Sequence, residues 1–381
     1  MLDPADPTSG HRPRVLVVVL AGGAGGRLAP LTDHRAKPSL PFGGTYRLID
    51  IALSQVAHSG LQDVWVIEQY EPHALNDHLA NGRPWDLDRT HGGLRIMPPF
   101  QRGDGEDAMA AGNAEALVQH RHLLAEAAPD IVITMSADHV FRLDLRDVVA
   151  THTAAAATLT IVTTEPPTAD DLTRFAWVGV EDERVTTFEY KPDEPTGDRI
   201  CTEVFAYDGA ELLTRLSALA EGGPAGDYGD RLLPELVADG GVVEHRLEGY
   251  WRDVGTINAY HRAHMELLGD DPMLRLDDRA WPLLTGSILG GPARVGSSAE
   301  VVRSLLSPGV EVHGAVESSV LGRNVVVEAG ALVRNSVVLD DAVVRAGAIV
   351  DAAIVEAGAH VGGHDEGRRD EGWNVTVYPA A

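Results

Sequence analysis

From residue 285 onward, aliphatic side chains recur at a spacing of six positions. Three such pairs have glycine or other small residues between them: Val310 and Val316, Val326 and Leu332, Val343 and Ile349. This spacing is typical of a left-handed parallel β-helix, whose coils stack one aliphatic residue on each flat side. A β-sandwich is the competing interpretation, but these segments lack the clean apolar–polar alternation of half-buried strands. We therefore predict a left-handed parallel β-helix for residues 285–381.

The preceding part of the chain has a different pattern. Two kinds of segment alternate there: apolar runs bounded by turn residues, at 15–20, 64–67, 131–135 and 159–163, and stretches of helical character, at 46–59, 113–127 and 143–156. Strands that alternate with helices indicate an α/β domain with a mostly parallel sheet covered on both faces.

These patterns divide the chain into four parts. Residues 1–12 are rich in Pro, Asp and Gly without periodicity, which indicates a flexible leader. The α/β pattern then predicts a domain at 13–265. Residues 266–284, which contain Asp270-Asp271-Pro272, are predicted to form a linker to the β-helix at 285–381.

Composition narrows the classes of partner. The formal net charge of −26 argues against nucleic acid or an anionic membrane as the main partner, because both need a basic surface. Cys201 is the only cysteine, which excludes an internal disulfide and suits a reducing compartment. The first apolar run, 15–20, is too short for a membrane span or a signal peptide. We expect a cytoplasmic protein with no nucleic-acid or membrane partner.

The lysine content points to two positions. Of the 31 basic residues, 29 are arginines and only Lys37 and Lys191 are lysines. A chain so biased toward arginine is expected to keep lysine where a compact ammonium group cannot be replaced by a wide guanidinium group. The simpler interpretation is that both are surface lysines without a function, but both lie in the motifs described next.

A glycine-rich turn follows the first predicted strand. The run Ala21-Gly22-Gly23-Ala24-Gly25-Gly26-Arg27 can bring backbone N–H groups close to a phosphate or a nucleoside. By itself such a run indicates only a tight connection. Arg35 and Lys37 follow closely and add positive charge. Glycines and cations together predict an anion-binding site.

Two aspartates are candidates for a metal site. Asp138 follows the apolar run 131–135, and Asp253 lies in Tyr250-Trp251-Arg252-Asp253-Val254-Gly255-Thr256. In open α/β sheets ligands bind at the carboxyl ends of the strands, so a carboxylate placed there faces the crevice. Either aspartate alone would serve as a helix cap or turn residue. Converging on one crevice, the two would suit Mg²⁺ bound to substrate phosphates.

Four segments resemble the bacterial glucose-1-phosphate adenylyltransferase (ADP-glucose pyrophosphorylase) family: Leu20-Ala21-Gly22-Gly23-Ala24-Gly25-Gly26-Arg27-Leu28, Arg35-Ala36-Lys37-Pro38, Phe42-Gly43-Gly44 with Tyr46-Arg47-Leu48-Ile49-Asp50, and the segment from Tyr250 to Thr256. The resemblance covers nearly the whole chain from about Val15. It implies a Rossmann-like sugar-nucleotidyltransferase domain that carries a C-terminal left-handed β-helix, in a homotetramer or homodimer. It also implies the reaction, in which an NTP and a sugar-1-phosphate give an NDP-sugar and pyrophosphate by in-line attack on the α-phosphorus.

The resemblance implies roles for individual residues. Catalysis falls to Arg27, Lys37, Asp138 and Lys191, and Asp138 and Asp253 resemble the Mg²⁺ ligands. The nucleotide-binding positions are Leu20, Ala21, Gly22, Gly23, Gly25, Gly26, Arg27, Gln69, Phe100, Gln101 and Gly112. The positions that contact the sugar phosphate are Ala176, Tyr190, Lys191, Cys201, Glu203 and Trp251.

Several base and sugar positions depart from the family pattern. Phe100-Gln101 stands for a Gln-Gln pair near the base, and Tyr190 replaces a Glu that reads sugar hydroxyls. Cys201 and Glu203 replace a Ser and a Gly. His34 replaces the activator lysine, so control by sugar phosphates is not implied.

These departures leave alternatives open. The default is ATP with glucose-1-phosphate, and the alternative is guanylyl or other nucleotidyl transfer to a cyclitol phosphate such as valienol-1-phosphate. A non-catalytic regulatory homologue would have lost a phosphate cation or a metal ligand, and this chain keeps them. A hexapeptide-repeat acyltransferase needs a catalytic histidine between β-helix coils. His313 and His360 lie at different places in the repeat, and that interpretation leaves residues 15–265 unexplained.

Overall fold

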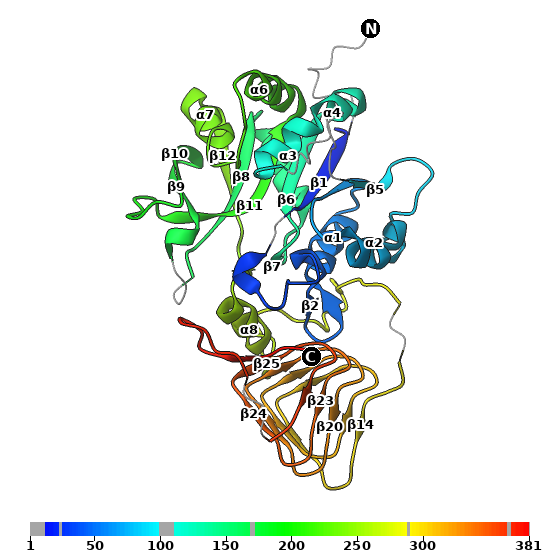
Figure 1. The fold of residues 1–381 in the computed structure, drawn as a ribbon. Coiled ribbons are helices and arrows are strands. Elements are labelled where there is room, and N and C mark those ends of the chain that lie inside the picture. Colours follow the sequence, from blue (N-terminus) through cyan, green and yellow to red (C-terminus); the bar gives the residue numbers. More distant parts are fainter. Residues whose placement is uncertain are drawn as a thin grey trace.

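The computed structural model describes residues 12–22, 25–98, 110–167, 172–287, 290–363 and 367–380. An α/β domain is followed by a column of stacked coils that packs against its lower end (Figure 1). Among the described residues, no helix combines the length and apolar character needed to cross a membrane.

A nine-stranded sheet forms the centre of the α/β domain. Its order is β5-β4-β1-β6-β11-β8-β12-β10-β9. The strands are β1 (Val15–Ala21), β4 (Asp63–Glu68), β5 (Gly93–Met97), β6 (Ile131–Ser136), β8 (Leu159–Thr164), β9 (Ala176–Glu181), β10 (Arg184–Tyr190), β11 (Arg199–Asp208) and β12 (Val242–Arg246). Each of the four apolar runs predicted from the sequence lies within one of these strands.

The α/β fold class is confirmed, but the sheet is mixed rather than mostly parallel. Neighbouring strands are parallel in the run β5-β4-β1-β6 and between β8 and β12. Strand β11 runs antiparallel to β6, β8 and β9, and strand β10 runs antiparallel to β9 and β12. Asp182 and Glu183 join β9 to β10 with positive φ at both residues, as a two-residue hairpin turn requires. Strands joined so tightly pair antiparallel without a crossover helix.

Helices cover both faces of this sheet. They are α1 (Leu48–His58), α2 (Pro72–Leu79), α3 (Asn113–Gln119), α4 (Arg121–Ala127), α5 (Leu145–Ala154), α6 (Gly209–Glu221) and α7 (Leu232–Asp239). Alternate residues of β1 face opposite sides, as the pleat of a strand requires. Val17 and Val19 pack in the core with α1, α2 and α5, while Leu16 and Val18 pack with α3, α4, α6 and α7.

Two predicted helices have different bounds. Tyr46–Arg47 (β3) pairs with Pro41–Phe42 (β2), so the first helix starts only at Leu48. The stretch predicted at 113–127 is interrupted at His120, which links α3 and α4. Short 3₁₀ segments complete the domain: η1 (Gly26–Leu28), η2 (Lys37–Ser39), η3 (Ala80–Trp85) and η4 (Leu172–Arg174).

The C-terminal part consists of three parallel sheets, consistent with a left-handed β-helix. The first contains β14 (Arg294–Val295), β17 (Glu311–Val312), β20 (Val326–Val327), β23 (Val343–Val344) and β26 (His360–Val361). The second contains β15 (Glu300–Val302), β18 (Ala315–Glu317), β21 (Leu332–Arg334) and β24 (Ile349–Asp351). The third contains β16 (Leu305–Leu306), β19 (Val320–Leu321), β22 (Val337–Val338), β25 (Ala353–Val355) and β27 (Thr376–Tyr378).

The predicted spacing of six is present, but two of the three pairs are out of phase with the core. Val310 and Val316 are buried as expected. Ile349, by contrast, is 65% exposed and its neighbour Val350 is fully buried. Adjacent side chains on a strand point to opposite faces, so in double-valine segments the sequence does not show which residue faces inward. The residues that stack inside next to the second and third pairs are Val327, Val333, Val344 and Val350.

An apolar core joins the two parts of the molecule. Helix α8 (Ile257–Met265) lies between the sheet and the β-helix (Figure 1). Its Ile257 and Tyr260 share one buried cluster with Leu28, Val337 and Ile354. The β-helix is therefore packed directly against the segment that follows the glycine-rich turn.

Candidate active site

A cavity of about 320 Å³ lies at the carboxyl ends of the central strands. It gathers most of the site residues predicted from the sequence: Leu20, Gly22, Arg27, Lys37, Gln69, Gly112, Asp138, Ala176, Lys191, Cys201, Glu203, Trp251 and Asp253. Four other predicted residues are close in sequence to lining residues but do not line the cavity themselves: Ala21, Gly25, Gly26 and Tyr190. Gly23, Phe100 and Gln101 lie outside the described residues.

The glycine-rich turn ends at this cavity. β1 ends at Ala21, and Gly25 adopts a left-handed backbone with φ of 67° before η1 begins. The hydroxyl of Thr32 donates a hydrogen bond to the Gly25 carbonyl over 2.9 Å. Arg27, within η1, is exposed and borders the cavity. The turn therefore presents a cation beside the carboxyl end of β1.

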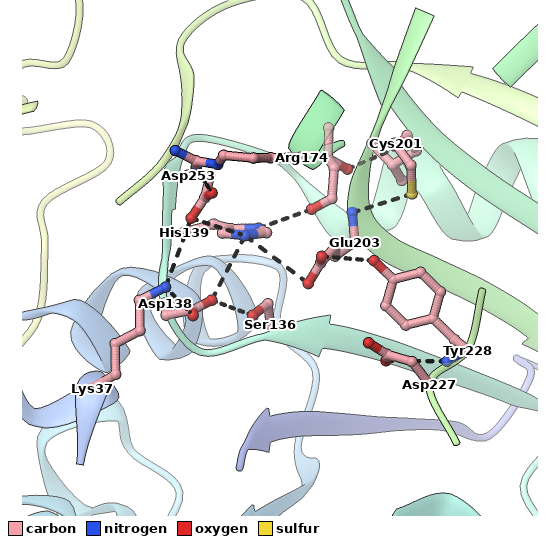
Figure 2. A network of polar contacts seen from close by, with 12 residues as sticks. Lys37, Ser136, Asp138, His139, Arg174, Cys201, Glu203, Asp227, Tyr228 and Asp253 are labelled. Carbon is pink, nitrogen blue, oxygen red and sulfur yellow. Dashed lines mark hydrogen bonds and ion pairs between the residues drawn. The ribbon is translucent and has the colours of Figure 1, made fainter. Parts of the chain in front are cut away.

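Lys37 is held between the two predicted metal ligands. Its Nζ lies 2.5 Å from Asp138 Oδ2 and 3.7 Å from Asp253 Oδ1 (Figure 2). The aspartates meet because β7 (His139–Phe141) pairs antiparallel with β13 (Trp251–Asp253), which sets Asp253 opposite His139. Arg174 donates a hydrogen bond to the other oxygen of Asp253.

The charges in this cluster stabilise one another. Burial opposes ionisation of Asp138 and Asp253, but the ammonium group of Lys37 overcomes that effect and lowers the pKa of both carboxyl groups. Burial likewise opposes the charge on Lys37, yet the two carboxylates raise the pKa of its ammonium group above the usual value. All three groups are therefore ionised at neutral pH.

His139 lies at the centre of the network (Figure 2). Its Nδ1 faces the Thr202 carbonyl at 3.1 Å and must therefore donate a hydrogen. Its Nε2 then faces carboxylates at 3.6 Å (Asp138), 3.9 Å (Asp253) and 4.0 Å (Glu203). His139 thus lies between the two aspartates and Glu203.

The two aspartates fit a divalent cation that also binds phosphate. A compact ammonium group already lies between their oxygens, which shows that this position is stabilised by positive charge. The described residues contain no group of three or more His, Cys, Asp or Glu side chains arranged to enclose a metal ion. Magnesium is commonly bound by one or two carboxylates together with substrate phosphates, so two ligands suffice for that mode.

The far side of the cavity contains a second polar cluster. Lys191 Nζ donates a hydrogen bond to the Tyr190 hydroxyl over 2.6 Å, and that hydroxyl donates to Asp227. The Tyr228 hydroxyl donates to Glu203 over 2.6 Å. Cys201 is buried, burial raises the pKa of its thiol, and its sulfur accepts a hydrogen bond from the Glu203 amide. A thiol in that state is not an activated nucleophile.

Sequence reasoning missed several polar residues of this site, among them His139, Arg174, Asp227 and Tyr228. His139 adjoins Asp138, and only the pairing of β7 with β13 sets it opposite Asp253. Arg174 precedes β9 in η4, a segment with no periodic pattern. Asp227 and Tyr228 lie between Gly226 and Gly229, and glycines that flank polar residues after a helix are the one signal that could have identified them.

Glu68, at the end of β4, carries a buried carboxyl group next to cavity residue Gln69. Neither its Oε1 nor Asn76 Oδ1 has a hydrogen-bond partner among the described residues. Burial raises the pKa of Glu68 from 4.5 to about 7, partly opposed by a hydrogen bond with Asn76. The folded protein therefore keeps this proton over a pH range in which the unfolded chain has lost it.

We expect this carboxyl group to make the protein less stable as pH rises from about 4.5 to 7, by up to roughly 3 kcal/mol. Glu68→Gln, which supplies a neutral amide donor toward Asn76, should remove that part of the pH dependence. Urea unfolding at about pH 5 and pH 8 measures the difference, with exposed Glu221→Gln as the control. An equal effect of Glu68→Gln at both pH values would contradict the expectation.

Both parts of the chain resemble known protein families. A family model described as nucleotidyl transferase matches residues 16–269, and one described as GlmU-like, C-terminal hexapeptide matches residues 292–368. Curated relatives include glucose-1-phosphate adenylyltransferases. The one from Pseudothermotoga lettingae is 36% identical over 82% of this chain and 75% of its own length. The one from Halalkalibacterium halodurans is 36% identical over 81% of this chain and 80% of its own length. The one from Thermomicrobium roseum is 40% identical over 77% of this chain and 69% of its own length.

Proposed function

The chain belongs to the nucleotidyl transferase family, and we propose that it transfers the adenylyl group of ATP to glucose-1-phosphate, forming ADP-glucose and pyrophosphate. That it is a sugar-1-phosphate nucleotidyltransferase follows from the family match over residues 16–269 and from the relatives. The choice of ATP and glucose-1-phosphate rests on those relatives, which are glucose-1-phosphate adenylyltransferases.

One observation in the structure supports the proposal most strongly. The buried Lys37–Asp138–Asp253 cluster lies in the same cavity as Arg27 of the glycine-rich turn and Lys191 of the far side. Several cations that line one cavity can neutralise a triphosphate and a second phosphate brought close together. The two aspartates supply the cation-binding position that such a pair of anions needs.

In the proposed reaction an oxygen of the sugar phosphate attacks the α-phosphorus of ATP. A new P–O bond forms on the α-phosphorus, the bond from that phosphorus to the β-phosphate bridge breaks, and pyrophosphate leaves with the electron pair. The attacking oxygen is already anionic, so no protein base or nucleophile is required. Arg27 would hold the β- and γ-phosphates and Lys191 the sugar phosphate, which aligns the reacting atoms.

Asp138 and Asp253 would hold a divalent cation, for which we propose Mg²⁺. When bound, Mg²⁺ neutralises phosphate charge and withdraws electrons from the phosphorus that is attacked. Lys37 keeps both aspartates ionised and ordered, and its ammonium group adds a second positive charge beside the phosphates. The role of Lys37 is thus both to bind phosphate and to position the two aspartates.

The proposal is tested by pyrophosphate release with ATP, GTP, UTP and CTP, each paired with glucose-1-phosphate and with valienol-1-phosphate in the presence of Mg²⁺. We expect the highest kcat/KM for ATP with glucose-1-phosphate, and release at the blank level from an Asp138→Asn variant. Preference for GTP with the cyclitol phosphate would overturn the substrate assignment but keep the reaction class. Blank-level release from every pair would contradict the catalytic proposal itself.

A further inference from the structure

Glu203 occupies an unusual backbone position at the edge of the cavity. In the pairing of β11 with β8, the register shifts between Cys201 and Phe205, which indicates a β-bulge. Glu203, inside this irregular stretch, adopts φ of 59°. A residue with a side chain is strained in the left-handed region, whereas glycine is not, and such strain concentrates at functional sites. The bulge turns the Glu203 side chain into the cavity beside His139 (Figure 2).

One oxygen of the Glu203 carboxylate is fixed and the other is available. Oε1 accepts the hydrogen bond of the Tyr228 hydroxyl over 2.6 Å. Oε2 lies 4.0 Å from His139 Nε2, beyond hydrogen-bond distance, and accepts no hydrogen bond from the part of the chain that the structure describes. The side chain is 29% exposed, and Glu203 lines the cavity.

Tyr228 is held rigidly enough to orient the carboxylate. Its ring centroid lies 5.1 Å from that of Phe205 and 5.6 Å from that of Tyr190. Its backbone N–H donates to Asp227 Oδ1 over 3.1 Å. Burial and then the charge of Glu203 raise the pKa of its hydroxyl group well above the usual value, so it remains a donor.

The other carboxylate on this side of the cavity is already satisfied. Asp227 Oδ1 accepts hydrogen bonds from the backbone N–H groups of Asn113 and Tyr228, over 3.3 and 3.1 Å. Its Oδ2 accepts from the Tyr190 hydroxyl. Asp227 therefore holds Tyr190 in place, and Glu203 is the carboxylate with an oxygen left for a ligand.

We propose that Glu203 determines acceptor specificity: its Oε2 accepts a hydrogen bond from a ring hydroxyl of a polyhydroxylated sugar or cyclitol phosphate whose phosphate is bound near Lys191. This inference rests on the proposed function, since it concerns the second substrate of the same site. Lys191 uses one of its three donors on Tyr190 and keeps the others for a phosphate. Tyr228 acts as a positioning residue, because it orients the carboxylate without contacting the acceptor.

The test compares glucose-1-phosphate with its 2-, 3-, 4- and 6-deoxy analogues in the wild type, Glu203→Gln and Glu203→Gly. Calorimetric binding and kcat/KM from pyrophosphate release are both measured. In the wild type, one deoxy analogue should be worse by about 10- to 100-fold, because it leaves the charged acceptor in the cavity wall without its hydrogen bond. Glu203→Gln should reduce that ratio and Glu203→Gly should bring it below about 3-fold. Tyr228→Phe should raise the acceptor KM more than it lowers kcat.

Glu183→Gly is the matched control. Glu183 also has positive φ, 63°, but lies exposed in the turn between β9 and β10, away from the cavity. Glu183→Gly should melt at or above the wild-type temperature, because glycine relieves the left-handed strain. Glu203→Gly gains the same relief but leaves the buried Tyr228 hydroxyl without its acceptor, so circular dichroism must show that this variant is folded. Only Glu203→Gly should change acceptor selectivity, while the KM for the NTP should stay within about 2-fold in either.

The two hypotheses fail in different ways. If the wild type and Glu203→Gly discriminate among the deoxy analogues by equal ratios in calorimetry, the role of Glu203 is overturned, whether or not the protein turns over. If the sugar phosphates bind with the expected selectivity but no NTP yields pyrophosphate, the proposed reaction fails and the binding role stands. If the wild type binds none of the sugar phosphates, both are overturned.

Discussion

Replacing Asp138 by asparagine is expected to lower kcat for pyrophosphate release by about 1,000-fold or more. The substitution keeps the size of the side chain but removes the charge that lies 2.5 Å from Lys37 Nζ. It also removes one of the two proposed metal ligands. The loss should appear mainly in kcat, because the interactions concerned develop most strongly as charge moves onto the departing pyrophosphate.

The control for this variant is Asp182→Asn, the same change at an exposed turn outside the cavity. It should leave kcat and KM unchanged. The Asp138 variant must also be shown to be folded, for example by circular dichroism, because burial makes a lost ion pair costly. A folded Asp138→Asn protein with more than about one tenth of wild-type kcat would contradict the role given to this carboxylate.

Replacing Lys37 by methionine is expected to destabilise the protein by about 3–5 kcal/mol, because it leaves two buried carboxylates without their shared cation. Asp138 and Asp253 both owe part of their lowered pKa to Lys37. Lys37→Arg keeps the charge but places a planar, wider group in a space where the lysine side chain is only 8% exposed. We expect that variant to fold and to lose about 100-fold in kcat/KM for the NTP.

Lys191→Arg is the matched control for stability, since Lys191 is exposed. It should unfold at the wild-type urea concentration, whatever it does to acceptor binding.

The stability supplied by the Lys37–Asp138 pair should be constant between about pH 5 and pH 10. This stability should fall in acid below the pKa of 3.8 that Asp138 has in the unfolded chain, because the unfolded chain then takes up a proton that the folded pair resists. It should also fall in base, as pH rises through the raised pKa of Lys37. Wild-type stability for Lys37→Met would contradict the expectation.

The local sequence was enough to predict the strands that carry the site. The runs at 15–20 and 131–135 are apolar throughout, which is typical of central strands buried on both faces, and both lie within observed strands, β1 and β6. The rule that ligands bind at the carboxyl ends of such strands then identified Asp138, and the glycines and cations after the first run identified the anion-binding turn. These features depend on residues close together in the chain, so the sequence shows them directly.

Contacts between distant segments could not be predicted in the same way. Arg174 reaches Asp253, and Tyr190 reaches Asp227, only because segments far apart in the sequence fold onto one cavity. The Tyr190 ring fits because residue 229 is glycine: a Cβ atom there would come within 2.1 Å of the ring. Neither residue indicates the other in the sequence, since no shared period or motif joins them.

The sequence by itself thus determined the α/β domain and the β-helix and the position of the glycine-rich turn. It also identified the two lysines and the two aspartates as candidate site residues. The tertiary structure decided the direction of β9 to β11 and which of two adjacent aliphatic residues faces inward in each coil. It also decided which cavity carboxylate has an oxygen that accepts no hydrogen bond from the described residues. The physical reason is the range of the interactions. Periodicity and turn chemistry act over a few residues, whereas strand direction, burial phase and the hydrogen bonds of Glu203 depend on which distant segments the folded chain brings into contact.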